Sequence, residues 1–277
     1  MNHSDKFETN RKTWNTKAAI HFESDFYDMQ NFRKGKTSLN KYEIEALGDI
    51  SDKKLLHLQC HFGQDTLSFA RMGAKCTGVD ISDEGIMLAK QLNADLKLDV
   101  SFVCCNVLDT SEYVSEKFDI VFTSYGTIGW LPDLKPWAKM ISERLKPGGF
   151  FYIVEFHPIA WMFDYTVSPP VMKYGYQQKG AIYEEYEGTY ANIDSEMVSK
   201  EYGWNHSLGE VITSLSEAGL RIEYLKEYDA SPYDIFPKLV KNDEGMFELT
   251  DKMYPLIFEV KAKKKFRNLS CGILELG

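Results

Sequence analysis

Residues 54–66 read Lys-Leu-Leu-His-Leu-Gln-Cys-His-Phe-Gly-Gln-Asp-Thr. The apolar run that ends at Cys60 predicts a short buried strand, and the turn at His61-Phe62-Gly63 leads into a helix that we expect over residues 64–72. Gly73 stands where a C-terminal cap of that helix belongs. A buried strand that passes through a tight turn into a helix is typical of a βαβ unit, so this stretch decides the fold class.

The same alternation continues along the chain. We expect further strands over residues 74–79, 100–105, 118–124, 150–156, 220–228 and 256–262, and helices starting at Ser82 and covering residues 134–145 and 207–218. Strands that alternate with helices predict an α/β fold, in which a parallel sheet carries helices on both faces. Ligands bind such sheets beyond the carboxyl ends of the strands, which makes the turn at His61 a predicted ligand site.

Two segments lie outside this alternation. Residues 1–50 mix polar and aromatic side chains, and we expect an N-terminal cap of short helices, one of which starts near Ser38 and ends at Gly48. Residues 157–206 contain ten aromatic side chains, and we interpret this segment as an insertion or lid after the fifth strand. The main domain is then expected over residues 51–265, followed by a C-terminal tail at 266–277.

Composition excludes several classes of function. The chain has 277 residues, with 32 Lys and Arg against 41 Asp and Glu, and a net charge of −9. A protein that binds a duplex usually needs surplus cations, so we expect no nucleic-acid partner. No apolar stretch approaches the ~20 residues that cross a bilayer, and the N-terminus lacks an apolar signal core, so no membrane partner is expected.

The cysteines indicate the compartment. There are five, without a C-x-x-C pair, which is typical of reduced and buried thiols rather than of a disulfide framework. We therefore expect a cytoplasmic protein. The sequence does not indicate the oligomeric state.

The turn after the first strand restricts the ligand. A dinucleotide needs three glycines there, but only Gly63 is present, and side chains at Gln59 and His61 would crowd a diphosphate. Asp80 follows the second strand, where an acid can bind ribose hydroxyls, and a helix N-terminus suits a carboxylate. An amino-acid head, a ribose and an adenine without phosphates describe S-adenosylmethionine.

Four motifs in order then carry a family resemblance. They are Leu55-Leu-His-Leu-Gln-Cys-His-Phe-Gly-Gln-Asp-Thr66, Thr77-Gly-Val-Asp-Ile-Ser82, Phe118-Asp-Ile-Val-Phe122 and Leu145-Lys-Pro-Gly-Gly149. Together they resemble the class I S-adenosylmethionine-dependent methyltransferases that act on small molecules. The resemblance implies a Rossmann-like, doubly wound, seven-stranded sheet ordered 3-2-1-4-5-7-6, with strand 7 antiparallel. The family usually has an acid at the position of His57, glycines at Gln59 and His61, and often Asp at Asn106.

The resemblance also implies a cofactor, S-adenosylmethionine, and its product S-adenosylhomocysteine. Asp80 would bind the ribose hydroxyls, Ile81 and Val107 would flank the adenine, and Asn106 would bond its amino edge. The methionine end would meet the loop residues Gln59, Cys60, His61 and Gly63, and Tyr125 would lie beside the sulfonium. The N-terminal segment would close over the cofactor through Phe32, Gly35 and Ser38.

The implied reaction is an in-line displacement, in which the protein mainly aligns the two reactants and excludes water. His157, at the end of the strand over 150–156, is the predicted general base, and Tyr125 is the second predicted catalytic residue. The alternative for His157 is an ordinary strand exit, with its imidazole bonded to backbone. We predict no metal site, because His57 and His61 span a strand and a turn without a third ligand nearby.

Two other functions remain open from the sequence. One is a protein of the same fold that binds S-adenosylmethionine without turnover, which the departures at His57, Gln59 and His61 keep open. The other is an NAD(P)-dependent oxidoreductase, which the missing glycines disfavour. In the aromatic insertion, Glu184, Glu185 and Glu187 are compatible with a small cationic or planar substrate, or simply with a solvated acidic edge.

Overall fold

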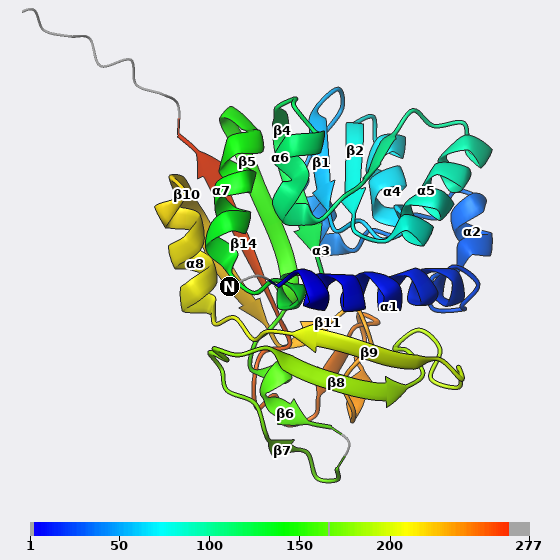
Figure 1. Cartoon of the computed structure of the whole chain (residues 1–277), viewed down its shortest axis with the longest axis vertical. Helices are drawn as coiled ribbons and strands as arrows, with labels where there is room; N and C mark the ends of the chain where they lie inside the picture. The colour runs from blue at the N-terminus through cyan, green and yellow to red at the C-terminus, as the bar shows by residue number, and fades with distance from the viewer. Residues whose placement is uncertain (1–2, 166, 266–277) are drawn as a thin grey trace, which may run out of the picture.

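A computed structural model describes residues 3–165 and 167–265, and its centre is a seven-stranded sheet (Figure 1). The sheet order is β10-β14-β5-β4-β1-β2-β3. The strands are β1 (Lys54–Leu58), β2 (Lys75–Asp80), β3 (Ser101–Cys104), β4 (Phe118–Ser124), β5 (Leu145–Phe156), β10 (Leu220–Tyr228) and β14 (Ile257–Lys264). Numbered within the sheet alone, this order is 3-2-1-4-5-7-6, which confirms the predicted topology.

The pairing confirms the direction of each strand. β1 is parallel to both β2 and β4, β2 is parallel to β3, and β4 is parallel to β5. β14 is antiparallel to β5 and to β10, so the seventh strand is the reversed one. The order reverses between β1 and β4, and their carboxyl ends therefore flank the crevice in which such folds bind ligands.

Helices cover both faces of the sheet. They are α1 (Ser4–Phe22), α2 (Met29–Arg33), α3 (Lys41–Leu47), α4 (Gln64–Arg71), α5 (Asp83–Asp95), α6 (Thr110–Tyr113), α7 (Leu134–Arg144) and α8 (Leu208–Glu217). Side chains alternate in direction along a strand, so successive residues enter the hydrophobic cores on opposite faces of the sheet. Leu55 packs with α3, α4 and α5, whereas Leu56 packs with α7 and α8.

Several predicted boundaries are confirmed and others are wrong. Ser82 and Ser207 cap α5 and α8 by accepting a backbone N–H, and Gly48 ends α3 with a positive φ of 63°. The helix predicted to start near Ser38 starts instead at Lys41, where the Glu43 carboxylate accepts the Asn40 N–H. The fifth strand starts at residue 145 rather than 150.

The N-terminal cap differs from the expected set of short helices, because α1 has 19 residues. Its buried side chains are mostly polar, so the usual apolar stripe is absent from the sequence. Asn10 exchanges two hydrogen bonds with the backbone of Tyr202, at 2.9 and 2.8 Å. Thr13 donates to the Lys200 carbonyl at 2.6 Å. The helix thus docks on a neighbouring strand through polar groups.

That neighbour belongs to the segment over residues 157–206. Its β8 (Ile182–Glu187) and β9 (Val198–Gly203) form an antiparallel hairpin, and α1 lies between this hairpin and the main sheet (Figure 1). The same segment holds η3 (Ala160–Met162), β6 (Phe163–Asp164) and β7 (Val171–Met172). All of these lie outside the seven-stranded sheet. Movement of this segment as a lid stays a prediction.

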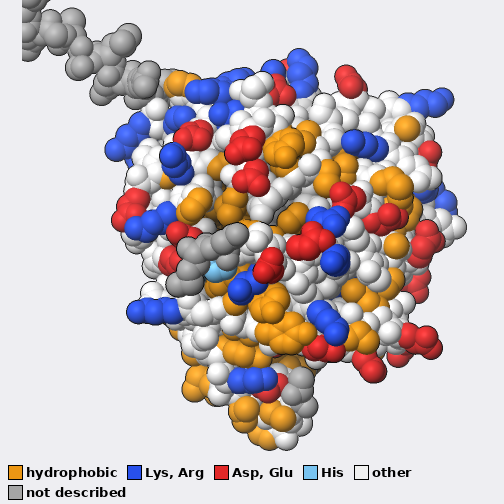
Figure 2. Space-filling view, in the orientation of Figure 1, with side chains coloured by type: hydrophobic (Ala, Val, Ile, Leu, Met, Phe, Trp, Pro, Cys, Tyr) orange, Lys and Arg blue, Asp and Glu red, His pale blue; other side chains and the backbone are white. Residues whose placement is uncertain are grey.

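A third small sheet was missed by the sequence analysis. It contains β11 (Ala230–Ser231), β12 (Leu239–Lys241) and β13 (Phe247–Leu249), between the last two strands of the main sheet. The remaining short elements are η1 (Val107–Asp109) and η2 (Ile128–Trp130). Charged side chains of both signs cover the face shown in Figure 2, and apolar ones gather at its lower end. In the same orientation, Figure 1 shows β6 and β7 at this end.

Two further expectations concern the state of the cysteine thiols and the presence of a membrane-spanning helix. Cys60, Cys76 and Cys105 are buried free thiols, but Cys104 is exposed, because it closes the edge strand β3. Cys271 and the predicted tail at 266–277 lie outside the described residues. Within the described part of the chain, no helix combines the length and the apolar character that a membrane span requires.

The docking of α1 gives a first prediction. Asn10→Ala leaves the N–H and carbonyl of Tyr202 without their partners, so we expect a loss of about 2–4 kcal/mol in the free energy of unfolding. The exposed Thr16 of the same helix is the control, and Thr16→Ala should change this free energy by no more than about 0.5 kcal/mol. Urea unfolding measures both. Equal effects of the two substitutions would contradict the polar docking.

Candidate active site

A cavity of about 1280 Å³ lies at the carboxyl ends of β1, β2 and β4. All nine predicted cofactor-binding residues line it: Gln59, Cys60, His61, Gly63, Asp80, Ile81, Asn106, Val107 and Tyr125. Phe32 and Ser38 of the N-terminal cap line it too, as predicted, but Gly35 is not among its lining residues. The structure therefore brings together residues that the sequence spreads over about 65 positions.

The loop after β1 has an unusual backbone. Gln59, His61 and Gly63 have φ angles of 54°, 53° and 76°. The first two lie in the left-handed region that side chains disfavour, at a cost of about 1–2 kcal/mol each. Gly63 is required for a second reason, because a Cβ there would come within 2.5 Å of the Phe102 ring. The loop thus has the left-handed backbone conformation of a glycine-rich loop, although only one of the three positions is a glycine.

Asp80 holds this loop against the second strand. Its two carboxylate oxygens accept the backbone N–H groups of His61 and Ser82, both at 2.8 Å. Burial raises the pKa of Asp80 to about 6, although these hydrogen bonds act in the opposite direction. The carboxylate lies next to Ile81 on the cavity wall.

Glu155 organises the loop after β4. Its buried carboxylate accepts the backbone N–H groups of Gly126, Thr127 and Ile128, the latter two at 2.7 and 3.3 Å, and the Thr127 hydroxyl at 3.0 Å. Burial raises the pKa of Glu155, while the N–H groups lower it. This carboxylate shapes the backbone that follows Tyr125. The sequence alone did not indicate this role of Glu155.

Tyr125 begins that loop and faces the cavity. Its φ is 36°, and its N–H donates to the Val154 carbonyl at 2.9 Å. Its buried hydroxyl has no hydrogen-bond partner among the described residues, and burial raises its pKa well above 10. Tyr125 is therefore a neutral donor next to the cavity, edge-on to the ring of Tyr233.

His157 does not reach the cavity, so the prediction of a general base is not supported there. The side chain is 1% exposed and is absent from the cavity wall. Nδ1 accepts the Ile159 N–H at 3.2 Å, and Nε2 lies 2.8 Å from the Glu227 carboxylate. The physical reason is strand alternation together with the pairing of β14 against β5, which turns residue 157 toward β10. The bonding matches the strand-exit alternative.

His57 is buried as well, although it is one of the residues that line the cavity. Its Nδ1 lies 2.8 Å from the Thr66 hydroxyl, and burial lowers the pKa of the imidazole to about 3. His61 points elsewhere, and its Nε2 lies 3.1 Å from Nδ1 of His21. The described residues contain no group of three or more His, Cys, Asp or Glu that could hold a metal ion.

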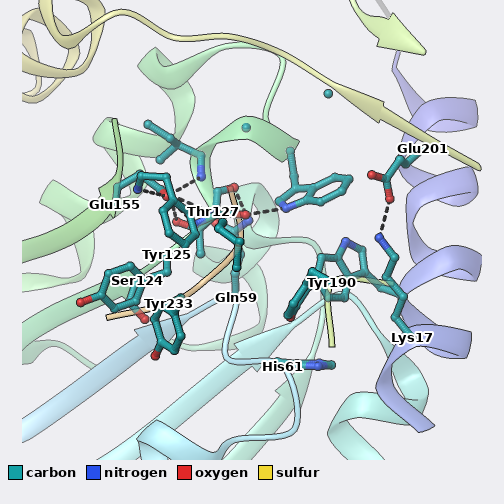
Figure 3. A pocket seen from close by; sticks show the side chains of 18 of the residues that line it. Lys17, Gln59, His61, Ser124, Tyr125, Thr127, Glu155, Tyr190, Glu201 and Tyr233 are labelled. Carbon is teal, nitrogen blue, oxygen red and sulfur yellow. Dashed lines mark hydrogen bonds and ion pairs between the residues drawn. The ribbon is translucent and has the colours of Figure 1, made fainter. Parts of the chain in front are cut away.

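The cap supplies residues that the sequence analysis missed. Lys17 is 1% exposed and forms an ion pair with Glu201 at 2.7 Å, and both line the cavity (Figure 3). Trp14 packs edge-on against His61 and Trp130, with ring centroids 5.3 Å apart in each case. The available signal was the spacing of Asn10, Thr13, Lys17 and His21, which places polar residues along one face of a helix.

Comparisons with known proteins agree with this geometry. Residues 56–153 match a family model described as "Methyltransferase domain". This stretch is similar to a methyltransferase domain and runs from β1 to β5 of the sheet. The chain is 31% identical over 157 residues to the ubiquinone biosynthesis O-methyltransferase of Pseudoalteromonas translucida, a match that covers 53% of this chain and 65% of that protein. The chain thus spans somewhat less than two thirds of this curated relative.

Solved structures share the fold at low sequence identity. An S-adenosylmethionine-dependent methyltransferase from Clostridium acetobutylicum superposes with a TM-score of 0.57 at 13% identity, covering 91% of this chain and 99% of that one. The glycopeptide N-methyltransferase MtfA, crystallised with S-adenosylmethionine, has a TM-score of 0.54 at 14% identity and covers 80% of this chain and 92% of its own. The family resemblance predicted from the motifs and the methyltransferase fold are both confirmed.

The Glu155 contacts give a second prediction. Glu155→Gln turns an amide N–H₂ toward backbone donors, so we expect a loss of about 2–4 kcal/mol in stability and a disordered loop over residues 125–130. Glu259→Gln is the matched control, because Glu259 is equally buried and accepts from Tyr152 and Tyr228 away from the cavity. Urea unfolding and amide hydrogen exchange measure the two effects. Faster exchange at residues 125–130 in both variants would contradict the assignment.

Proposed function

We propose that this chain transfers the methyl group of S-adenosylmethionine to a small-molecule acceptor by in-line displacement. The observation that carries the proposal is the cavity at the reversal point of the sheet, which Asp80, Ile81, Asn106, Val107 and Tyr125 line together. The match of residues 56–153 to a methyltransferase family model supports it. The relative and the solved structures named above are methyltransferases by name.

The residues present fit the cofactor. Asp80 offers carboxylate oxygens to ribose hydroxyls, and Ile81 and Val107 offer apolar walls to an adenine. Asn106 uses its Oδ1 to accept the Leu108 N–H at 3.0 Å, which leaves its Nδ2 as the donor toward the cavity. The side chains of Gln59 and His61 occupy the loop where a diphosphate would need bare backbone, which disfavours a dinucleotide.

The remaining cavity favours an acceptor with a planar or apolar body. Its wall contains Phe156, Trp161, Tyr190 and Tyr233, together with the Lys17–Glu201 ion pair. The helix α1 and the β8–β9 hairpin lie over it, which suits a small molecule rather than a polymer (Figure 1). The named relative from Pseudoalteromonas translucida is an O-methyltransferase, and oxygen is accordingly our proposed acceptor atom.

This reaction depends on the alignment of the two reactants more than on acid or base catalysis. When bound, S-adenosylmethionine supplies an already activated methyl group. Tyr125 stays neutral because of its raised pKa, and its free hydroxyl can orient the acceptor beside the methyl donor. The covering helix and hairpin would shield the reactants from water, and the cavity wall would hold them at the ~3–3.5 Å separation that displacement needs.

For the compartment we propose the cytoplasm, because Cys60, Cys76, Cys104 and Cys105 are free thiols.

Calorimetry with S-adenosylhomocysteine tests the cofactor assignment. We expect saturable binding that weakens as the pH falls through about 6, because ribose hydroxyls favour the ionised form of Asp80 and protonation opposes it. Asp80→Ala should lower the affinity on the order of 100-fold and remove this pH dependence. Asp95→Ala, an exposed acid on α5, should change neither.

Two outcomes would contradict the proposal. A folded wild-type protein without measurable affinity would exclude the cofactor. Saturable binding without transfer of a labelled methyl group to any component of a small-molecule extract would favour the binding protein without turnover.

A further inference from the structure

The side chain of Gln59 stands in the crevice between the two central strands. Gln59 follows β1, and its Nε2 donates to the carbonyl of Thr127, in the loop after β4, at 2.8 Å. The strand order reverses between these two strands, so the amide spans the point where ligands bind. Figure 3 shows it between Tyr125 and Tyr233 on one side and His61 and Tyr190 on the other.

The Thr127 bond fixes the orientation of the amide. A carbonyl oxygen accepts only from a donor, so the atom that faces it is the amide nitrogen rather than the amide oxygen. Oε1 of Gln59 is therefore the free end. It is buried and has no hydrogen-bond partner among residues 3–165 and 167–265. A buried acceptor without a partner is unfavourable, so the site is built for an occupant that donates a hydrogen bond.

The rest of the cavity narrows the choice of donor. If the proposed function holds, the ribose hydroxyls lie at Asp80 at the end of β2, and the adenine with its amino group lies beside Ile81, Asn106 and Val107. Both lie on the β2–β3 side of β1, whereas Gln59 turns toward β4. The donor that remains in S-adenosylmethionine is the α-ammonium of its amino-acid head.

We propose that Oε1 of Gln59 accepts a hydrogen bond from the α-ammonium of the cofactor, and that this contact selects ligands with an intact amino-acid head. The inference rests on the proposed cofactor. It explains why a side chain occupies a left-handed position, φ 54°, where the family usually has glycine. The strain at this position is offset by an amide that both ties the two loops together and binds the ligand.

A pair of ligands isolates this contact. S-adenosylhomocysteine and its deaminated analogue differ in the ammonium alone, so calorimetry on the wild type gives a ratio of two affinities. Gln59→Met keeps the length of the side chain and removes the oxygen, and Gln59→Gly restores the backbone preference of the family. In both variants we expect the preference for S-adenosylhomocysteine to fall about 10- to 100-fold, as for a hydrogen bond to a charged group.

Asn106→Ala is the matched control, because it should weaken both ligands equally and leave the ratio unchanged. Thermal unfolding shows which variants are folded. If Gln59→Met does not fold, Gln59→Gly still provides the test. An unchanged ratio in the folded variants, even with weaker binding of both ligands, would overturn the role of Gln59 and leave the proposed function intact. A folded wild type that binds neither ligand would overturn the proposed function itself.

Discussion

The left-handed backbone of the loop after β1 is the constraint on which the site depends. Gln59 and His61 carry a conformation that costs about 1–2 kcal/mol each, so surrounding contacts must hold it. Asp80 accepts the His61 N–H, and Gln59 reaches Thr127 across the crevice. The N-terminal cap adds Trp14, His21 and Tyr27, whose rings lie 5.2–5.6 Å from that of His61. This packing around His61 gives a structural reason for the aromatic residues of the N-terminal cap.

The fold was predictable from the sequence because its signals are local. Short apolar strands and the serine caps at Ser82 and Ser207 identify the alternation, and the order of the motifs identifies the topology. The long helix α1 was not predictable in this way, since it packs through Asn10, Thr13 and Lys17 on a strand that lies about 190 positions further along the chain. Because its buried face is mostly polar, α1 has no periodic apolar pattern in the sequence.

The ends of the strands explain which residues the sequence could place beside the cavity. Residues at the carboxyl ends of parallel strands meet at one edge, so Asp80, Asn106 and Tyr125 were predictable as neighbours. The direction of a side chain at a strand exit depends on local pairing, which is why His157 turned out to face Glu227. The contacts of Glu155 and Lys17 arise from loops and long-range packing, for which the sequence holds little signal.

The most direct test of the preshaped loop is a crystal structure of the protein with S-adenosylhomocysteine. The account predicts the adenine between Ile81 and Val107, the ribose hydroxyls on Asp80, and the α-ammonium of the amino-acid head on Oε1 of Gln59. The φ angles at Gln59 and His61 should still be positive. A ligand bound elsewhere, or a loop that leaves the left-handed region when the ligand binds, would contradict it.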